Sequence, residues 1–470
     1  GHYMNEEKKT KGTVSFYTLG CKVNQYETQM LKERFSDAGY DIAGEEEFAD
    51  IYVVNTCTVT GIADRKSRKM LHRPKRINNE AIVVAMGCFA EAEREKLLSD
   101  SGIDIIIGNG EKEHAYDIIM DYIGQKDTKA YEKSECYSYE SFVFNEHIRA
   151  YVKVQDGCNQ FCTYCKIPYV RGKLKSRNIS DICKEIEALA DAGFMEVVLT
   201  GIHLSSFGVD KTDKTSFTEL KGEPLCELIE SVSRIPGIKR IRLGSLEPRI
   251  ITDEFVKKIS GVEKLCPHFH LSLQSGCDET LARMNRKYNT DEYYEAVRIL
   301  RKYYDRPSVT TDVICGFPGE TDEEFDESLN FVKKIRFSMI HVFKYSRRAG
   351  TKAYSMPNQV NEEVKNQRSS IMIDTAKKLT ASYAESFIGS IQNCLVEETT
   401  KIDGKLYYIG HNERYMKLAF EAGGTPCDII NTIVRVIPEK YAGDEVLLCS
   451  TKVTIHGSTI LDKVSSCLHE

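Results

Sequence analysis

Three short apolar runs near the start of the chain each lead into a cysteine, and this pattern strongly restricts the possible folds. The three runs with their cysteines are Val14–Leu19 with Cys21, Ile51–Asn55 with Cys57, and Ile82–Met86 with Cys88. Charged amphipathic stretches lie between the runs, so strands and helices are expected to alternate around a parallel sheet. In an open sheet of this kind the carboxyl ends of the strands form the binding crevice. We therefore expect the three cysteines to meet in space despite their separation in sequence.

A second series of strand and helix signals begins at residue 148 and predicts a partial or full parallel barrel. The six expected strands are Ala150–Gln155, Glu196–Thr200, Ile238–Gly244, His268–Leu273, Thr310–Cys315 and Met339–Phe343. The chemistry of such barrels is located at the carboxyl ends of the strands. The polar, aperiodic segment 126–147 is expected to link this barrel to the first sheet.

The last part of the chain has a different pattern, in which a long helix over 361–386 precedes short alternating segments. These expected strands are Ser390–Glu397, Lys405–His411, Met416–Phe420, Ile433–Val436 and Glu445–Thr454. Their number and spacing predict a small β-barrel. The chain is thus expected to be an α/β protein with an open-sheet domain at 12–125, a linker at 126–147, a barrel at 148–385 and a β-domain at 386–470.

Length and composition exclude several classes of protein. A chain of 470 residues exceeds the roughly 100–200 residues of one ordinary domain. No apolar run approaches the roughly 20 residues that span a bilayer, and the start of the chain lacks the apolar centre of a signal peptide. We expect a cytoplasmic protein with no membrane partner. Sixteen cysteines in such a chain favour metal ligation over disulfides.

Cys158, Cys162 and Cys165 form a C-x3-C-x2-C motif directly after the first expected strand of the barrel. Three thiolates are one too few to complete either a tetrahedral zinc site or a fully ligated four-iron cluster. A [4Fe–4S] cluster on this motif would leave one iron open for a cofactor. A zinc site with a remote fourth ligand is the alternative.

The stretch CNQFCTYCKIPYVRG at 158–172 resembles the signature of the radical S-adenosylmethionine (SAM) methylthiotransferases. TLGCKVNQYET, VNTCTVT and AMGCFA, around the three N-terminal cysteines, resemble motifs of the same family. The resemblance extends over essentially the whole chain, and the final β-domain is similar to the family's TRAM domain, an RNA-binding barrel. It implies two [4Fe–4S] clusters, each with an open iron. One, on the C-x3-C-x2-C motif, would chelate SAM and generate a radical, and the auxiliary one would carry the sulfur that is transferred.

The resemblance also implies positions that contact the cofactor. An aromatic residue before the last cysteine belongs to the family pattern, and further positions lie at the ends of barrel strands. These positions are Tyr164, Thr200, Gly201, Ser272, Gln274, Gly316 and Pro318. A glycine at a strand end lets the backbone approach a ligand, although such glycines occur in many βα proteins. Glu247 and Arg286 either face the same cavity or belong to structural ion pairs.

The first cysteine motif, GCKVNQYET, resembles the MtaB-type branch of the family. That branch converts N6-threonylcarbamoyladenosine beside the tRNA anticodon to its 2-methylthio derivative. The alternatives are methylthiotransferases that act on isopentenyladenosine in tRNA or on an aspartate of a ribosomal protein, and a non-catalytic iron–sulfur or zinc protein. The expected partners are tRNA, a sulfur donor, and an electron donor such as a flavodoxin or ferredoxin.

A basic run follows Cys57 closely and is the expected RNA-binding segment. RKSRKMLHRPKR, at 65–76, holds seven Lys or Arg in twelve residues. The side chains expected to contact phosphates are Arg65, Lys66, Arg68, Lys69, Arg73 and Arg76. A second basic group follows the C-x3-C-x2-C motif and comprises Arg171, Lys173, Lys175 and Arg177. A solvated charged face is the alternative for both, and the net charge of −6 excludes a uniformly basic surface.

The ten cysteines outside the two triads are expected to be small buried hydrophobes. They are Cys136, Cys183, Cys226, Cys266, Cys277, Cys315, Cys394, Cys427, Cys449 and Cys467.

Overall fold

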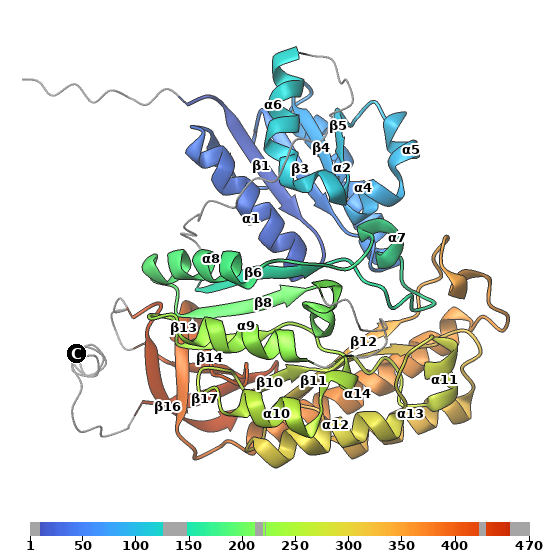
Figure 1. Cartoon of the computed structure of the whole chain (residues 1–470), viewed down its shortest axis with the longest axis vertical. Helices are drawn as coiled ribbons and strands as arrows, with labels where there is room; N and C mark the ends of the chain where they lie inside the picture. Colours follow the sequence, from blue (N-terminus) through green and yellow to red (C-terminus); the bar gives the residue numbers. More distant parts are fainter. Residues whose placement is uncertain (1–9, 126–147, 212–219, 221, 423–428, 452–470) are drawn as a thin grey trace, which may run out of the picture.

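The computed structural model describes residues 10–125, 148–211, 220, 222–422 and 429–451. The expected linker and the residues after 451 lie outside this part of the chain, as do Cys136, Cys427 and Cys467. An N-terminal domain lies above a larger barrel domain, and a C-terminal β-barrel lies at the lower left (Figure 1). No helix in the described ranges is long and apolar enough to cross a membrane.

The N-terminal domain contains the predicted parallel sheet. Its strands are β1 (Thr13–Thr18), β2 (Asp41–Ala43), β3 (Ile51–Thr56), β4 (Ile82–Gly87) and β5 (Ile105–Ile107). Its helices are α1 (Lys22–Asp37), α2 (Gly61–His72), α3 (Pro74–Ile77), α4 (Cys88–Ala92), α5 (Arg94–Leu98), η1 (Asn109–His114) and α6 (Ala115–Gln125). The strand order is β2-β1-β3-β4-β5, with all neighbours parallel. Every residue of β3 is buried, as expected for the middle strand of a sheet covered on both faces.

The barrel domain is an open, partial (β/α) barrel. Its strands are β6 (Arg149–Asp156), β7 (Lys175–Ser176), β8 (Glu196–Gly201), β9 (Arg240–Leu243), β10 (His268–His270), β11 (Ser308–Cys315) and β12 (Met339–Lys344). They form two sheets, β7-β6-β8-β9 and β10-β11-β12, joined by the parallel bridges Ile241–Leu265 and Leu246–Leu271. Among the described strands, the first and last parallel ones, β6 and β12, are not paired with each other, so the barrel stays open between them. The predicted fold class is confirmed.

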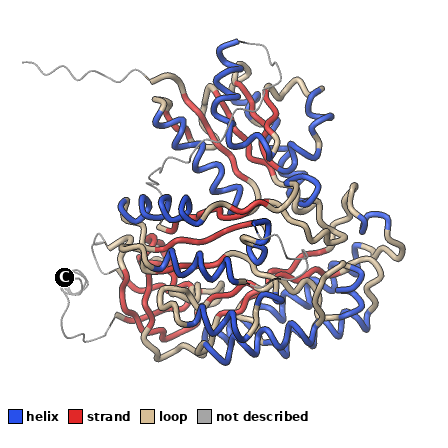
Figure 2. Tube along the Cα trace, viewed as in Figure 1, coloured by secondary structure: helices blue, strands red, loops and turns tan. Residues whose placement is uncertain are grey.

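Helices cover the outside of this open barrel (Figure 2). The helical segments of the domain, including the short ones in its loops, are α7 (Ile167–Arg171), α8 (Ile179–Asp191), η2 (Leu204–Ser206), η3 (Val209–Lys211), α9 (Glu223–Ser233), η4 (Pro248–Ile250), α10 (Asp253–Ser260), α11 (Asp278–Arg283), α12 (Thr290–Tyr303), α13 (Asp322–Ile335), η5 (Lys352–Ser355) and α14 (Glu362–Glu385). The main hydrophobic core lies between these helices and the strands. The long helix α14 packs against β12 and leads to the last domain.

The C-terminal domain is a closed five-stranded barrel, as predicted. Its strands are β13 (Gln392–Ile402), β14 (Lys405–His411), β15 (Lys417–Glu421), β16 (Ile433–Tyr441) and β17 (Val446–Ser450). They close in the order β13-β14-β15-β17-β16. Its interior is filled by buried side chains that include Cys394, Tyr408 and Phe420.

The C-terminal barrel packs against the amino-terminal ends of the barrel strands. Arg149 begins β6, and its Nη2 donates to Glu397 of β13 at 2.6 Å. Arg240 begins β9, and its Nη1 donates to the carbonyl of His411 at 2.9 Å. Glu196, which begins β8, is fully buried between Arg149 and Arg242. The C-terminal barrel therefore closes the end of the larger barrel that is opposite to its active end.

A buried cluster of charges joins the N-terminal domain to the barrel domain. Glu27 of α1 pairs with Lys112, with Lys153 of β6 at 3.3 Å and with Arg171 of α7 at 3.3 Å. Burial raises the pKa of Glu27, but the three cations outweigh it and hold that pKa far below its usual range. These contacts fix the carboxyl edge of the first sheet relative to the start of the barrel.

Candidate active site with two cysteine triads

The first triad, Cys21, Cys57 and Cys88, lies at the carboxyl ends of three neighbouring strands. Cys57 follows β3 directly, Cys88 follows β4 directly, and Cys21 lies three residues after β1. Because β1, β3 and β4 are adjacent in the sheet, the structure brings the three cysteines to one edge. The thiol of Cys57 interacts electrostatically with both Cys21 and Cys88. Cys57 and Cys88 are buried, whereas Cys21 is exposed.

Two glycines allow the first triad to assemble. Gly20 has φ 95°, and a Cβ built on it would lie 2.6 Å from Sγ of Cys57. Gly87 has φ 104°, and a Cβ there would lie 2.5 Å from the carbonyl oxygen of Thr56. Both positions need the conformational freedom of glycine and the space that a missing side chain leaves. This role was not predicted from the sequence, although the glycines directly before Cys21 and Cys88 were the available signal.

The second triad, Cys158, Cys162 and Cys165, lies on the loop between β6 and α7, at the active end of the barrel. The amide of Cys165 donates to the carbonyl of Cys162 at 3.0 Å, and the amide of Ile167 donates to Sγ of Cys165 at 3.4 Å. A guanidinium nitrogen of Arg286, Nη1, donates to Sγ of Cys162 at 3.0 Å. Arg286 therefore faces the thiols, which agrees with the cavity-facing expectation.

Neither triad has the spacing of a single-ion site. Zinc–sulfur bonds of about 2.3 Å place tetrahedral thiolate sulfurs about 3.8 Å apart. In the described residues, the ligand atoms of neither triad all lie within 4.8 Å of one another. At least one pair of sulfurs in each triad is thus too far apart for one zinc ion, whereas a larger cluster can span such a gap.

Buried thiols and buried guanidinium groups together fit an anionic cluster. Burial raises the pKa of Cys57 to about 11, of Cys158 to about 11 and of Cys165 to about 12, so each needs a cation to become a thiolate. Nε of Arg171 and Nε of Arg348 are buried with no hydrogen-bond partner in the described structure. Both arginines interact electrostatically with cysteines of the triads. The sulfides of an iron–sulfur cluster bound to these thiols would accept hydrogen bonds from such donors.

Several of the expected cofactor positions lie at barrel strand ends near the second triad. Thr200 and Gly201 end β8, and a Cβ on Gly201 would lie 2.6 Å from Oε1 of Gln155. Ser272 and Gln274 follow β10, and Gln274 adopts φ 72° while its amide donates to the carbonyl of Asp312 at 2.9 Å. These residues share the active end of the barrel with the cysteine loop.

Two other expected positions are covered by protein. Gly316 follows β11 with φ 76°, and a Cβ there would lie 2.3 Å from Cγ of Lys365 in α14. Pro318 is buried, and its carbonyl accepts from Nε of Arg283 at 3.1 Å. These two residues shape the turn after β11.

Tyr164 links the cysteine loop to an aromatic group. Its ring packs edge-on against Phe317 with centroids 6.3 Å apart, and Phe317 packs against Tyr345. Burial raises the pKa of Tyr164 well above its usual value, so the phenol stays protonated.

Glu247, at the turn after β9, is a buried carboxylate at the active end. Its partners are Arg249 and His203, whose Nε2 lies 3.7 Å away. Burial raises its pKa, but the neighbouring His203 and Arg249 outweigh this effect and hold the pKa at about 2. Arg249 also donates to the side chain of Gln160 in the cysteine loop at 3.3 Å. Glu247 therefore orients Arg249 toward the second triad.

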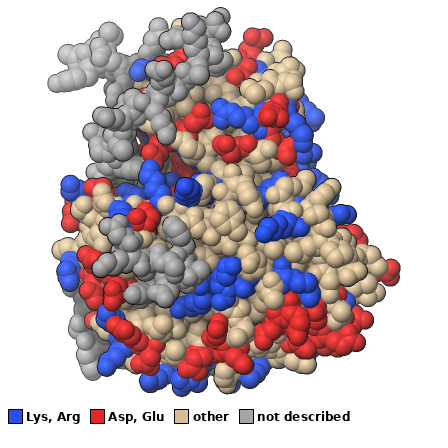
Figure 3. Space-filling view, turned by 45° about the vertical axis from the view of Figure 1, so that its right-hand side comes forward, with Lys and Arg blue, Asp and Glu red and all other residues tan. Residues whose placement is uncertain are grey.

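The basic run forms the exposed face of helix α2 and continues into α3. Ser67, on the buried face of α2, donates to the carbonyl of Cys57 at 3.0 Å, which fixes the helix beside the first triad. Arg65, Lys66, Lys69 and Arg76 are exposed, and none of these four has an ion pair with the described residues. Arg68 lies 4.0 Å from Glu93, and Arg73 pairs with Glu46. Basic and acidic side chains alternate over the upper part of the molecule, and a large acidic group lies at the lower right (Figure 3).

The second basic group is a patch only in part. Lys173 and Lys175 are exposed, but the side chain of Arg171 is 1% exposed and pairs with Glu27 and Asp156. Arg177 donates to Glu185 at 2.7 Å. The expectation of a surface role is wrong for Arg171, because it is buried between Glu27 of the N-terminal domain and Asp156 of β6.

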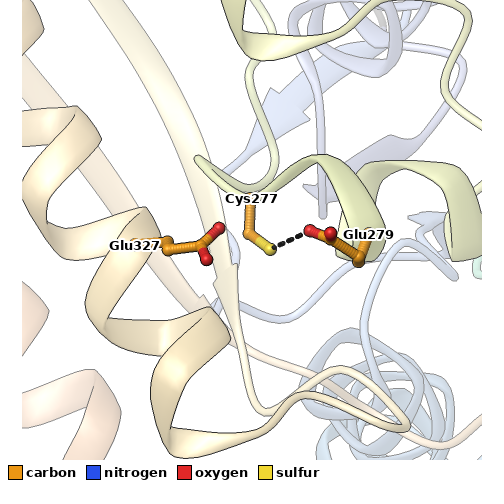
Figure 4. A group of neighbouring side chains, drawn as sticks. All are labelled: Cys277, Glu279 and Glu327. Carbon is orange, nitrogen blue, oxygen red and sulfur yellow. Dashed lines mark hydrogen bonds between the residues drawn. The ribbon is translucent and has the colours of Figure 1, made fainter.

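Most of the remaining described cysteines are buried, as expected, and Cys183 and Cys449 are partly exposed. Cys277 lies between Glu279 and Glu327 (Figure 4). Its Sγ donates to Glu279 at 3.1 Å, and burial raises its pKa to about 12. Cys277 is thus a protonated thiol that donates a hydrogen bond to the carboxylate of Glu279.

Two family models match this chain. The radical SAM superfamily matches residues 152–332, which include the second triad. An uncharacterized protein family, UPF0004, matches residues 13–108, which include the first triad.

Curated relatives match most of the chain. A threonylcarbamoyladenosine tRNA methylthiotransferase, MtaB, from Bacillus subtilis is 38% identical over 435 residues, covering 90% of this chain and 93% of that protein. A tRNA-2-methylthio-N(6)-dimethylallyladenosine synthase from Pelotomaculum thermopropionicum is 35% identical, covering 90% and 94%. Among solved structures, the radical SAM methyltransferase TsrM from Kitasatospora setae has a TM-score of 0.54 at 14% identity, covering 83% of this chain and 79% of that one. That structural likeness concerns the fold.

Proposed function

The chain belongs to the radical SAM methylthiotransferase family, and we propose that it converts N6-threonylcarbamoyladenosine beside the tRNA anticodon to its 2-methylthio derivative. The observation that carries this proposal is the pair of separate cysteine triads, one on each of two domains that are joined by buried charges. The choice of nucleoside is supported by the MtaB relatives, which are 34–38% identical to this chain.

The radical SAM family uses SAM and a [4Fe–4S] cluster, and this chain offers Cys158, Cys162 and Cys165 as the ligands. When bound, the cluster and SAM supply the radical that removes hydrogen from the substrate. Arg286 compensates negative charge at Cys162. Arg249, oriented by Glu247, presents a cation to the same loop through Gln160. Thr200, Gly201, Ser272 and Gln274 are the strand-end groups that would contact SAM.

We assign a second [4Fe–4S] cluster to Cys21, Cys57 and Cys88. These residues leave one iron without a protein ligand, which is the position for the sulfur to be transferred. Helix α1 begins directly after Cys21, and Cys88 begins α4, so helix amino termini add partial positive charge beside two of the thiolates.

The partners follow from this chemistry. The exposed face of α2 lies next to the first triad and carries the cations that would hold tRNA phosphates, which position a substrate without reading its sequence. Reductive cleavage needs an external electron donor such as a flavodoxin or ferredoxin, and repeated turnover needs a sulfur donor. A cytoplasmic location agrees with these partners.

A second candidate substrate is N6-isopentenyladenosine in tRNA, because dimethylallyladenosine synthases are 32–35% identical to this chain. Mass spectrometry of tRNA nucleosides separates the two substrates. Cells that lack the gene should lose only the 2-methylthio form of threonylcarbamoyladenosine and should regain it with the wild-type gene. Loss of the isopentenyl derivative instead would assign the chain to the other branch. A ribosomal-protein peptide, incubated in place of tRNA, should stay unmodified.

A further inference from the structure

Arg348 connects the end of the barrel to the turn that carries Cys57. It lies on the loop after β12, and its side chain is 5% exposed. Nη1 donates to the carbonyl of Val59 at 2.9 Å, and Nη2 donates to Oγ1 of Thr58 at 2.6 Å. The amide of Val59 in turn donates to Sγ of Cys57 at 3.4 Å. One guanidinium from the barrel domain therefore holds the two residues that follow a cysteine of the other domain.

The same loop also contacts the second triad. The amide of Ala353 donates to the carbonyl of Thr163 at 2.9 Å, and Thr163 lies between Cys162 and Cys165. Thr351 supports the loop internally, since its Oγ1 donates to the carbonyl of Arg348 at 2.8 Å. Residues 345–353 are thus hydrogen-bonded to both cysteine-bearing segments.

The charge of Arg348 reaches both triads. It interacts electrostatically with Cys57 and Cys88 of the first triad and with Cys165 of the second. Two other buried guanidinium groups each serve one triad, since Arg171 interacts with Cys21 and Cys88, and Arg286 hydrogen-bonds to Cys162. Asp64, 3.7 Å from Arg348, offsets part of its charge, but Nε of Arg348 stays buried without a partner in the described structure.

We propose that Arg348 is a positioning residue that couples the two triads, because its guanidinium fixes the Cys57 turn while its charge stabilises the reduced state of a cluster on either side. This inference rests on the proposed function, which assigns a cluster to each triad. An iron–sulfur cluster gains negative charge on reduction, and a nearby buried cation therefore raises its reduction potential. Arg286, in contrast, should affect only the barrel cluster.

The test measures each cluster separately in the full-length chain, with the other triad changed to Ala. Reduction is followed by electron paramagnetic resonance at controlled potential. Arg348→Gln should lower the reduction potential of both clusters by about 59 mV, which is a tenfold change in the equilibrium constant of a one-electron reduction. Arg286→Gln should shift the barrel cluster alone. Arg347→Gln is the matched control, because the neighbouring Arg347 is exposed and donates to the carbonyl of Tyr354.

Arg348→Lys separates charge from positioning. It keeps the cation but loses the fork that binds Thr58 and Val59 together. Its reduction potentials should stay near those of the unchanged protein. A chelator should remove iron from the first triad faster than it does in the unchanged protein, and from the second triad at the same rate. If Arg348→Gln fails to fold, as judged by circular dichroism, this variant still tests the positioning, and iron loss from the first triad at the rate of the unchanged protein would overturn it.

The outcomes distinguish this inference from the proposed function. About eight irons in the protein with unchanged potentials in Arg348→Gln, or a shift at only one cluster, would overturn the coupling alone. About four irons in the protein with intact cysteines would overturn the second cluster, and the coupling with it.

Discussion

At the scale of single residues, the two triads are separable by substitution. Cys162→Ala should abolish formation of 5′-deoxyadenosine, because the barrel cluster loses a ligand that no neighbouring side chain replaces. Cys57→Ala should still form 5′-deoxyadenosine but deliver no methylthio group, because the barrel cluster has its own ligands. Chromatography of the nucleoside and mass spectrometry of tRNA measure the two products. Full methylthiolation by Cys57→Ala, or radical formation by Cys162→Ala, would contradict the division of roles.

Gly20 provides a test of how the first triad assembles. Gly20→Ala forces a side chain into a left-handed conformation, which costs roughly 1–3 kcal/mol, and places Cβ against Sγ of Cys57. We expect the reconstituted variant to hold about four irons, those of the barrel cluster. Gly110→Ala is the control, because Gly110 has an ordinary φ and nothing within 4 Å of an added Cβ. Equal iron contents in both variants would show that the close approach at Gly20 is dispensable.

At the scale of elements, helix α2 is the expected contact with tRNA. Replacing Arg65, Lys66, Lys69 and Arg76 together by Ala should weaken binding and lower the salt slope by roughly one unit for each lost phosphate contact. A charge-matched control replaces Lys333, Lys334, Lys377 and Lys378 on α13 and α14, which lie far from α2 (Figure 1). Fluorescence anisotropy at several salt concentrations gives the slopes. Equal salt slopes of tRNA binding in the two quadruple variants would show that the basic face of α2 is only solvated and does not contact tRNA.

The elements also show how far the sequence could predict the structure. Strand β14 begins and ends where its pattern predicted, and the meeting of Cys21, Cys57 and Cys88 at one edge could be predicted because each follows a strand end. Strands β2 and β7 were missed, since segments of two or three residues carry no periodic signal and pair only where the tertiary fold offers an edge. The burial of Glu27 and Arg171 could not be predicted either, because a charged residue taken alone is expected to be exposed to solvent. The role of Arg348 was missed because its contacts with Thr58 and Val59 depend on how a loop distant in sequence folds.

At the scale of the whole molecule, the buried ion network around Glu196 joins the two barrels. Burial raises the pKa of Glu196, but Arg242 and Arg149 outweigh it and hold that pKa far below its usual range. A depressed carboxyl pKa contributes stability above the pKa of the unfolded state and loses it as the pH falls. Glu196→Gln leaves buried cations uncompensated and should cost about 3–5 kcal/mol near neutral pH. The difference from the unchanged protein should shrink as the solution becomes acidic.

Denaturant unfolding of the reconstituted protein, followed by circular dichroism, measures this loss. Glu421→Gln is the control, because the Glu421–Lys405 pair is exposed on both sides and should contribute less than about 1 kcal/mol. A Glu196→Gln protein as stable as this control would mean that the network contributes nothing to cohesion.

The contacts of Arg240 and Arg242 with the C-terminal barrel have a consequence for modular engineering. Their guanidinium groups donate to the carbonyls of His411, Asn393, Asn412 and Glu413, so the terminal barrel supplies four acceptors beside those that Glu196 and His268 of the larger barrel offer. A truncated enzyme would expose these donors, and a grafted domain would have to reproduce four carbonyl positions. The terminal barrel is therefore not an interchangeable part. Domain exchanges between relatives should place the junction before β6, so that the two barrels are exchanged together.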